Sequence, residues 1–402
     1  MNNYAELKKI NIKNIVALLF ALRAISFVWL AFASDIYMPS YAVLVNIIRY
    51  STILIGFAYI LFSKNIKREY FIYTLPVIYY WLMLVFNTYG GYYGSYIQEL
   101  ICICCFLLMD EEQKIRIFKY FYIIIQICNL ISLILYACYI INIPIFNVVP
   151  FYNDGIQTSY YHQFGIWAVM GDRQYSLPRL CSIFNEPGGL GTVCGLLFAA
   201  TYSYSSKKEK LLLVITTICS FSMSGYIIIL FSLAIHLWSK SVKYTLGIVA
   251  IIIFFLMIPK IDWGNDFLNS FAKRFEITSS GIAGNDRTNA TFDSLYKSVL
   301  HSKNAIFGMG ANYTEGMGTA SIKSSLVQFG IVGFGIYIIL WLLSVLRASK
   351  LNKNCLILVI VFSIAILQRP ATFTNSYGYI LLFGAISFLL NMNRKQTFLA
   401  DN

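Results

Sequence analysis

The chain has 402 residues, of which 58% are hydrophobic and only 12% are charged. Soluble globular proteins carry roughly 25% charged residues, so this composition excludes an ordinary soluble enzyme and indicates a membrane protein. The formal charge of +13, from 31 Lys and Arg against 18 Asp and Glu, does not indicate nucleic acid, because membrane proteins concentrate Lys and Arg on their cytoplasmic side. We therefore expect membrane lipid, and no nucleic acid, among the partners.

Apolar runs of spanning or near-spanning length recur along the whole chain. Five precede the first long polar segment, at 15–34, 41–62, 70–86, 95–109 and 120–143. Six more lie at 188–204, 211–238, 244–258, 324–346, 355–367 and 377–392. The first run is too long for a signal peptide and lacks a small-residue cleavage site, so we expect an uncleaved span.

The run 211–238 has lysines on both flanks, which places both of its ends in the cytoplasm. Such a run must cross the membrane twice or not at all. The break at Ser222-Met223-Ser224-Gly225 predicts a tight turn between two short helices. The whole chain then has about twelve transmembrane helices, with both termini cytoplasmic and every short cytoplasmic loop basic.

The predicted fold is an all-α polytopic membrane protein forming a single domain over residues 1–402. Two long polar segments, 144–187 and 260–323, fall on the same external face. Long insertions among otherwise short loops usually carry function, so we expect the active site there.

The first external segment ends in the sharpest local motif, Arg179-Leu180-Cys181-Ser182-Ile183-Phe184-Asn185-Glu186-Pro187-Gly188-Gly189-Leu190-Gly191. Pro187 suits the first turn of a helix, which Asn185 or Glu186 can cap. The glycines allow close approach of a neighbouring helix or a ligand. Glu186 is therefore either a helix cap or a reactive carboxylate, and Arg179 either a headgroup anchor or a phosphate ligand.

The second external segment contains Arg274 and Arg287, followed by Gly308-Met309-Gly310. A planar guanidinium can bind phosphate oxygens through two hydrogen bonds, which suits a lipid diphosphate at the membrane surface. No strand precedes the Gly-Met-Gly triplet, so we interpret it as a turn and not as a nucleotide fingerprint. The three histidines have no metal-ligand spacing, and we expect neither a metal nor a cofactor.

Other polar and aromatic residues receive structural interpretations. Within the spans, Arg23 and Glu99 are expected to pair or to reach the interface, and Arg49 to be structural. The nine cysteines show neither zinc-type nor disulfide spacing, so we expect buried thiols. The external aromatics fit a membrane-interface belt better than sugar stacking; they are Tyr152, Tyr160, Tyr161, Trp167, Tyr175 and Trp263.

Over most of its length the chain resembles the bacterial O-antigen polymerase family (Wzy-type), which is related to the O-antigen ligases of the glycosyltransferase C group. The resemblance rests on the many spans, on Arg179 to Gly191, which looks like the family's Arg-x-x-x-x-Phe-x-Glu-Pro segment, and on the helix pair broken at Ser224-Gly225. It also includes Arg287, then Ile306-Phe307-Gly308-Met309-Gly310, then Gln328-Phe329-Gly330-Ile331-Val332-Gly333 opening the next span.

One departure separates the two activities within this resemblance. Ligases of the group carry a His-Asn pair about eleven residues before the glycine matching Gly330, and here that position holds Thr319-Ala320. The missing histidine favours the polymerase over the ligase and leaves the general base open.

The resemblance implies a glycosyltransferase of the bacterial inner membrane that acts on the periplasmic face in lipopolysaccharide biosynthesis. It would transfer a growing glycan from undecaprenyl diphosphate to a sugar hydroxyl of another lipid-linked repeat unit, with a chain-length regulator protein as partner. The expected catalytic residues are Arg179, Glu186 and Arg287. The expected substrate-binding residues are Arg173, Arg274, Lys323 and Arg369.

Two alternatives stay open at this point. An O-antigen ligase would use the same donor with the lipid A core as acceptor. A lipid-linked oligosaccharide flippase or another transporter would show inverted repeats around a midplane site, and the chain has one interrupted segment and no repeat.

Overall fold

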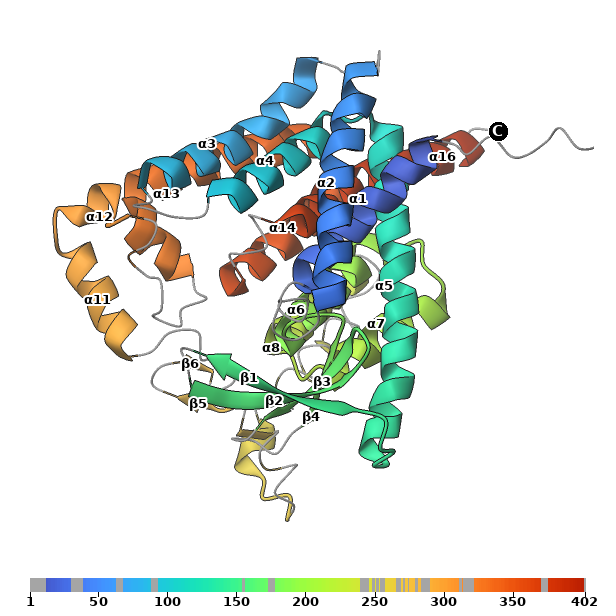
Figure 1. Cartoon of the computed structure of the whole chain (residues 1–402), viewed down its shortest axis with the longest axis vertical. Coiled ribbons are helices and arrows are strands. Elements are labelled where there is room, and N and C mark those ends of the chain that lie inside the picture. The colour runs from blue at the N-terminus through green and yellow to red at the C-terminus, as the bar shows by residue number, and fades with distance from the viewer. Residues whose placement is uncertain are drawn as a thin grey trace, which may run out of the picture. The chain divides into compact units, whose positions relative to one another are not determined.

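The structure is a computed structural model of the whole chain (Figure 1). It describes residues 12–29, 39–62, 68–87, 93–153, 156–172, 178–238, 290–310, 322–369 and 375–400, with shorter pieces between 246 and 282 and at 313. The described part is mostly helical, with a small antiparallel sheet.

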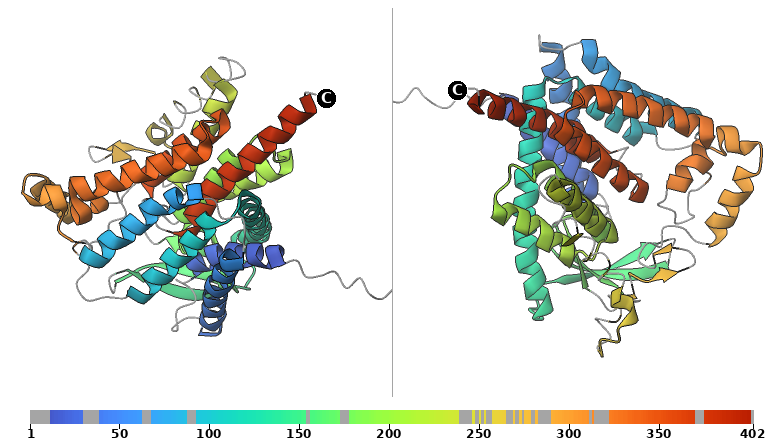
Figure 2. Two further views of the ribbon diagram at one scale, coloured as in Figure 1. Left: turned by 90° about the horizontal axis from the view of Figure 1, so that it is seen from above. Right: turned by 180° about the vertical axis from the view of Figure 1, so that it is seen from behind.

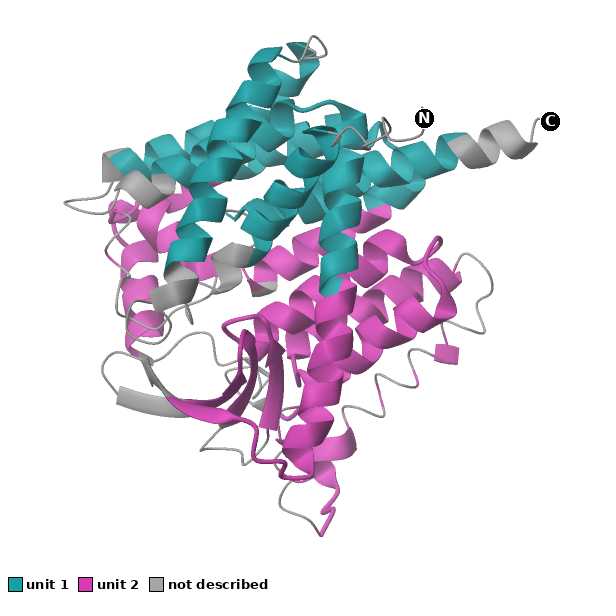
Figure 3. Ribbon diagram, turned by 45° about the vertical axis from the view of Figure 1, so that its right-hand side comes forward, with its two compact units in different colours: residues 1–125, 335–356, 372–402 teal, residues 126–334, 357–371 magenta. Residues whose placement is uncertain are grey.

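The chain divides into two compact units, each built from separate stretches of sequence (Figure 3). Unit 1 contains residues 1–125, 335–356 and 372–402. Unit 2 contains residues 126–334 and 357–371.

Unit 1 is helical in its described part. Its elements are α1 (Ile12–Trp29), α2 (Pro39–Phe62), the 3-10 turn η1 (Arg68–Tyr70), α3 (Phe71–Asn87), α4 (Tyr93–Leu108), the start of α5 (Glu111–Ile140), the end of α13 (Ile322–Ser349), the start of α14 (Lys353–Gln368), α15 (Ser376–Tyr379), the π-helical turn η6 (Ile380–Gly384) and α16 (Ala385–Ala400). Helix α2 packs against α1 and α4, and α15 packs against the same two helices. Figure 2 shows α3 and α4 running side by side. These helices confirm the helical character of the predicted runs, although α5 begins nine residues before the run 120–143 and α16 ends eight residues after the run 377–392.

Unit 2 combines helices with the sheet. Its elements are the rest of α5, β1 (Asn147–Asn153), β2 (Ile156–Phe164), β3 (Trp167–Asp172), β4 (Pro178–Ser182), α6 (Pro187–Thr201), α7 (Lys207–Cys219), α8 (Met223–Trp238), the 3-10 turn η2 (Ile258–Lys260), the short pair β5 (Ile277–Thr278) and β6 (Gly281–Ile282), α11 (Ala290–Leu300), α12 (Asn304–Phe307), the start of α13 and the rest of α14. The predicted run 244–258 lies mostly outside the described residues.

The four-stranded sheet corrects the expectation of an all-α chain. Strands β1 to β4 pair in sequence order and antiparallel, in the segment 144–187 that we expected to be a loop. In β2 the side chains alternate, with Tyr161 and Gln163 buried and Phe164 exposed. The strands are five to nine residues long and their side chains alternate. The prediction relied on long apolar runs, and strands of this kind contain none, so the sheet was missed.

The predicted break in the run 211–238 is confirmed. Helix α7 ends at Cys219 and α8 begins at Met223. Helix α7 starts with a capping box, in which Ser206 accepts from the Glu209 backbone and Glu209 accepts from the Ser206 backbone. The turn contains Phe221 at a positive φ of 49°, and small buried serines on both sides of it allow the two short helices to lie against α6.

Three helices of the described part are long and apolar enough to cross a membrane. They cover Val43–Phe62, Glu111–Ile140 and Ile322–Ser349, and shorter apolar helices accompany them. In α2 the exposed positions include Ile47, Leu54, Phe57 and Leu61, which recur at helical spacing along one face. An apolar face of this kind is stable when lipid covers it.

Candidate functional site

The segment from β4 to α6 forms the centre of the candidate site. Strand β4 pairs with β3 and ends at Ser182, whose φ of 56° turns the chain away from the sheet. Pro187 then opens α6, as predicted. Glu186 occupies the N-cap position in extended conformation, but its side chain makes no capping hydrogen bond. Of the two interpretations of Glu186, the side-chain helix cap is therefore contradicted, and the reactive carboxylate stays a prediction.

The Glu186 carboxylate instead pairs with Arg369. The Nη1 group of Arg369, just after the end of α14, donates to Glu186 Oε1. The arginine side chain is 12% exposed and the carboxylate 49% exposed, so the pair lies with its cation inward and its anion toward the surface. Arg369 Nε is buried without a hydrogen-bond partner among the described residues.

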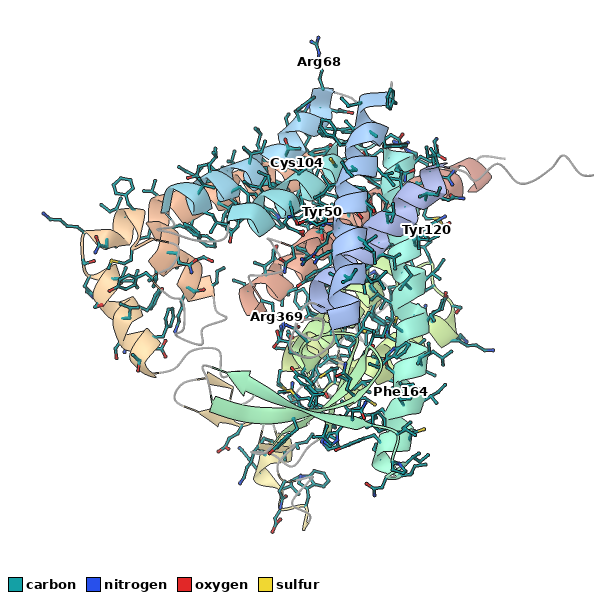
Figure 4. The ribbon with its side chains drawn as sticks, viewed as in Figure 1. Tyr50, Arg68, Cys104, Tyr120, Phe164 and Arg369 are labelled. Atoms are coloured by element: carbon teal, nitrogen blue, oxygen red, sulfur yellow. The ribbon has the colours of Figure 1, made fainter. Side chains whose placement is uncertain are left out.

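Gly188 provides the space for this arginine. A methyl group at Gly188 would overlap Arg369 Nη2, whereas one at Gly189 would make only an ordinary contact, 3.6 Å from Phe184. The guanidinium therefore lies against the backbone of the first turn of α6. The amide groups of that turn form the positive end of the helix dipole, so positive charge from Arg369 and from the helix converges here. Figure 4 labels Arg369, which contacts Gly188 at the start of α6.

Arg179 lies in β4 next to the same helix start. It is half-buried, and its Nε donates to the Ser220 carbonyl at 3.4 Å, at the C-terminal end of α7. Both Arg179 and Glu186 act electrostatically on Tyr161 and Cys181. Burial raises the pKa of the Tyr161 phenol, the Glu186 carboxylate raises it further and Arg179 opposes the rise. Arg179, Glu186 and Arg369 thus surround one small region.

Tyr161 connects strand β2 to the segment just before α6. Tyr161 is 3% exposed, and its hydroxyl donates to the Asn185 carbonyl, one residue before Glu186. The expectation that Tyr161 belongs to a membrane-interface belt is wrong, because the strand directs this side chain into the interior of unit 2. Trp263, by contrast, is 38% exposed, and its Nε1 donates to the Ile258 carbonyl.

Buried hydroxyl groups line the inner side of the site, and the sequence analysis did not assign them. The hydroxyl oxygen of Ser224 lies 2.9 Å from that of Thr192 and 2.9 Å from that of Ser222. The Thr192 hydroxyl donates to the Gly188 carbonyl at 2.8 Å. The helices approach this closely because the chain has glycines at the contact: a methyl group at Gly225 would lie 2.8 Å from the Gly191 carbonyl oxygen. The signal in the sequence was the group of small residues on both sides of the predicted turn.

The Gly-Met-Gly turn meets the kink of α13. Gly308 and Gly310 have positive φ values of 80° and 103°, which confirms the predicted turn. The Met309 and Gly310 amides donate to the Val327 and Gln328 carbonyls at 2.8 and 3.1 Å. Gly330 breaks the helix there with a φ of 67°. Two motifs that are twenty residues apart in sequence therefore form one backbone contact.

The remaining predicted residues separate into two groups. Lys323 pairs with Asp293 of α11 at 2.9 Å, and its ammonium lies 5.4 Å from the centroid of the Tyr296 ring. It is therefore engaged with α11, and its binding role stays a prediction. Arg173, Arg274 and Arg287 lie outside the described residues.

The histidines have local partners. His236 Nδ1 lies 2.8 Å from the Ser232 carbonyl, and its ring is 4.5 Å from that of Tyr202. His301 Nδ1 lies 2.8 Å from the Lys297 carbonyl. The His162 ring lies 4.7 Å from that of Tyr139 at a tilt of 50°, and burial lowers the pKa of His162. Within the described part of the chain, no three His, Cys, Asp or Glu residues gather as a metal site would require.

The nine cysteines are free thiols. Six are buried and Cys104, Cys138 and Cys219 are partly buried. The expectation of thiols within the protein interior is therefore confirmed for most of them.

Comparison of the chain with protein-family models, curated proteins and solved structures gave no significant match.

Proposed function

We propose that the protein is an O-antigen polymerase of the bacterial inner membrane, with a glycosyltransferase C-like fold of about twelve transmembrane helices. Its donor is a glycan linked to undecaprenyl diphosphate, and its acceptor is a sugar hydroxyl of a second lipid-linked repeat unit. The reaction takes place on the periplasmic face, where the segments 144–187 and 260–323 lie in this topology. Both termini are then cytoplasmic.

One observation carries the proposal: Arg369 is seated over Gly188 at the start of α6, with Arg179 nearby. In the transfer, the bond between the donor's anomeric carbon and the diphosphate oxygen breaks, and negative charge develops on the departing diphosphate. Two guanidinium groups and a helix N-terminus stabilise such charge without a metal. Preorganised donors of this kind are worth roughly 3–4 kcal/mol of transition-state stabilisation each.

Glu186 has a second role in this mechanism. The acceptor hydroxyl oxygen forms the new glycosidic bond, and its proton must leave. Before the donor binds, Glu186 is paired with Arg369. When the donor binds, a diphosphate oxygen takes the place of the Glu186 carboxylate on Arg369. The carboxylate is then released at the exposed rim, where it can orient the acceptor hydroxyl or accept its proton. Arg287 completes the diphosphate site in this proposal, with Arg173, Arg274 and Lys323 as further contacts.

The experiment is the surface-polysaccharide ladder of a strain that lacks the gene, complemented with wild type, Arg179→Ala, Arg369→Ala or Arg287→Ala. Arg68→Ala is the matched control, because Arg68 is exposed in η1 of unit 1 and lies outside the site. We expect the deletion strain to show a single repeat unit on the lipid A core. Wild type and Arg68→Ala should restore the ladder, and the three site variants should fail with protein present in the membrane.

Other outcomes identify the alternatives. Loss of even the single repeat unit in the deletion strain would contradict polymerisation and point to a ligase or a flippase. An unchanged ladder in the deletion strain would contradict a polymerase, a ligase and a flippase alike.

A further inference from the structure

The hairpin of α11 and α12 exposes apolar side chains at its tip. Phe307 of α12 is 73% exposed, Ile306 is 49% exposed, and Leu300 at the end of α11 is 38% exposed. Another side of α11 is already packed, because Phe292 and Val299 belong to the small core that holds the hairpin against α13. The tip therefore presents a second apolar surface, separate from the face that stabilises the hairpin.

Backbone contacts fix the position of this tip along α13. The amides of Met309 and Gly310, just after α12, donate to α13 carbonyls at 2.8 and 3.1 Å. A methyl group at Gly330 would lie 2.3 Å from the Ile306 carbonyl oxygen, so α12 touches α13 at its kink. Figure 1 shows α12 next to this end of α13. The exposed apolar side chains of α12 therefore lie at the level of Gly330.

Gly330 marks the point at which α13 changes from polar to apolar. The polar residues Lys323, Ser324, Ser325 and Gln328 precede it, whereas the run 331–346 that follows contains no charged residue. A helix of this length covers roughly 24 Å, most of the hydrocarbon core of a bilayer. Helix α13 is also one of the three described helices that are long and apolar enough to cross a membrane. The tip thus lies at one boundary of the hydrocarbon core.

The charge around the tip is positive. Lys297 and Lys303 are exposed on either side of the turn between α11 and α12. The segment 290–310 contains a single acidic residue, Asp293, which is paired with Lys323. Apolar side chains flanked by lysines are typical of segments that lie in the membrane interface, where the lysines reach lipid phosphates and the apolar groups enter the acyl region.

We propose that α12 is an interfacial membrane anchor. Phe307 and Ile306 enter the lipid beside the kink of α13, and Lys297 and Lys303 bind the phosphates of anionic lipids. A lipid surface fits this tip better than a second protein, because three exposed apolar side chains fall far short of the roughly 800 Å² per partner that a stable protein interface buries. The anchor requires that α13 crosses the membrane and is independent of the proposed glycan transfer.

Site-specific photo-crosslinking of the full chain identifies what touches the tip. The photoreactive amino acid p-benzoylphenylalanine replaces Phe307, and the purified protein is reconstituted in bilayers of equal parts phosphatidylcholine and phosphatidylglycerol. After irradiation, mass spectrometry measures the lipid adduct. The matched control carries the same amino acid at Thr291, an exposed position in the first turn of α11. We expect roughly tenfold less lipid adduct at Thr291, since burial of an aromatic side chain in lipid favours contact at Phe307.

The same adduct tests the role of the lysines. Phosphatidylglycerol should be enriched over phosphatidylcholine in the Phe307 adduct, and Lys303→Gln should lower this enrichment roughly fivefold. Lys353→Gln removes an exposed lysine beyond the other end of α13 and should leave the enrichment unchanged. Gel filtration of each variant verifies folding.

Several outcomes would overturn the anchor. One is the absence of a lipid adduct at Phe307, and another is an equal lipid yield at Phe307 and Thr291. A Phe307 adduct with a second copy of the chain would show that the tip is a protein interface. An equal loss of enrichment in Lys353→Gln and Lys303→Gln would contradict the binding of anionic lipid at the tip.

Discussion

At the scale of single residues, adjacent glycines have different roles. Gly188 leaves room for the Arg369 guanidinium, and Gly189 has only an ordinary contact with Phe184. Their sequence context, Pro187-Gly188-Gly189, does not distinguish them. The difference arises from Arg369, which is far away in sequence and reaches Gly188 only in the folded chain.

Gly188→Ala should therefore abolish polymer formation about as completely as Arg369→Ala. The new methyl group would displace the guanidinium from the start of α6, while alanine suits a helix as such. Gly189→Ala is the matched control and should keep the ladder. The measurement is the polysaccharide ladder, with membrane protein quantified by immunoblot. A normal ladder in Gly188→Ala would show that the position of Arg369 over Gly188 is not needed for activity.

His162 is the residue for which a pH effect follows from the structure. Burial lowers its pKa below the ordinary value of 6.5, so the folded protein binds the proton less well than the unfolded chain does. The stability contribution of neutral His162 is fully present above pH 6.5 and is lost as the pH falls from there through the folded pKa.

We expect the thermal unfolding temperature of wild type to fall below pH 6.5, and His162→Gln to show a smaller fall over the same range. His301→Gln, at the exposed end of α11, should keep the wild-type profile. The measurement is thermal unfolding in detergent as a function of pH. Identical profiles for His162→Gln and wild type would assign the acid sensitivity to other groups.

At the scale of elements, the contact between the Gly308 turn and the kink of α13 joins the segment 260–323 to a long helix. The Val327 and Gln328 carbonyls accept from Met309 and Gly310 just before the break at Gly330. The small core of Phe292, Val299 and Val327 covers this contact. The kink therefore has an identifiable cause, a positive-φ glycine whose neighbouring carbonyls bond to another segment.

Gly330→Ala should destabilise the protein by roughly 1–3 kcal/mol, because the new methyl group meets the Ile306 backbone and the left-handed conformation disfavours a side chain. Gly335→Ala lies on the same helix, with nothing within 4 Å of the added methyl group. It should be neutral or slightly stabilising. The thermal unfolding temperatures of both variants are measured in detergent. Equal shifts of this temperature would contradict a close backbone contact between the Gly308 turn and Gly330.

At the scale of the whole molecule, the distribution of basic residues determines the proposed orientation. Lys207, Lys208 and Lys210 precede α7, and this short basic loop is cytoplasmic in the proposed topology. The segment that carries α11 and α12 is external in the same topology. The polymerase proposal requires this arrangement, since its donor is consumed on the periplasmic face.

Cysteine labelling checks the orientation. In a background without the nine native cysteines, a membrane-impermeant maleimide applied to spheroplasts should label Lys303→Cys and leave Lys208→Cys unlabelled. Both positions are exposed, so accessibility within the fold is matched. A permeant maleimide should label both. The reverse pattern would place the active site in the cytoplasm and contradict the proposed donor.

Composition and periodicity by themselves determined most of the described helical segments, the turn between α7 and α8 and the helix start at Pro187, and they limited Arg23 and Glu99 to pairing or reaching the interface. The structure decided for the pair. These features depend on local hydrophobicity, on turn chemistry and on the cost of an unpaired charge in an apolar span, all of which are legible in short stretches of sequence. Only the tertiary structure decided that residues 147–182 form a sheet, that Tyr161 is buried, and that Glu186 pairs with Arg369 in place of capping α6. The strands pair with their neighbours in sequence, but their short alternating pattern contains no long apolar run. The Tyr161 and Glu186 contacts depend on partners that only the folded chain brings close, and no local pattern specifies those partners.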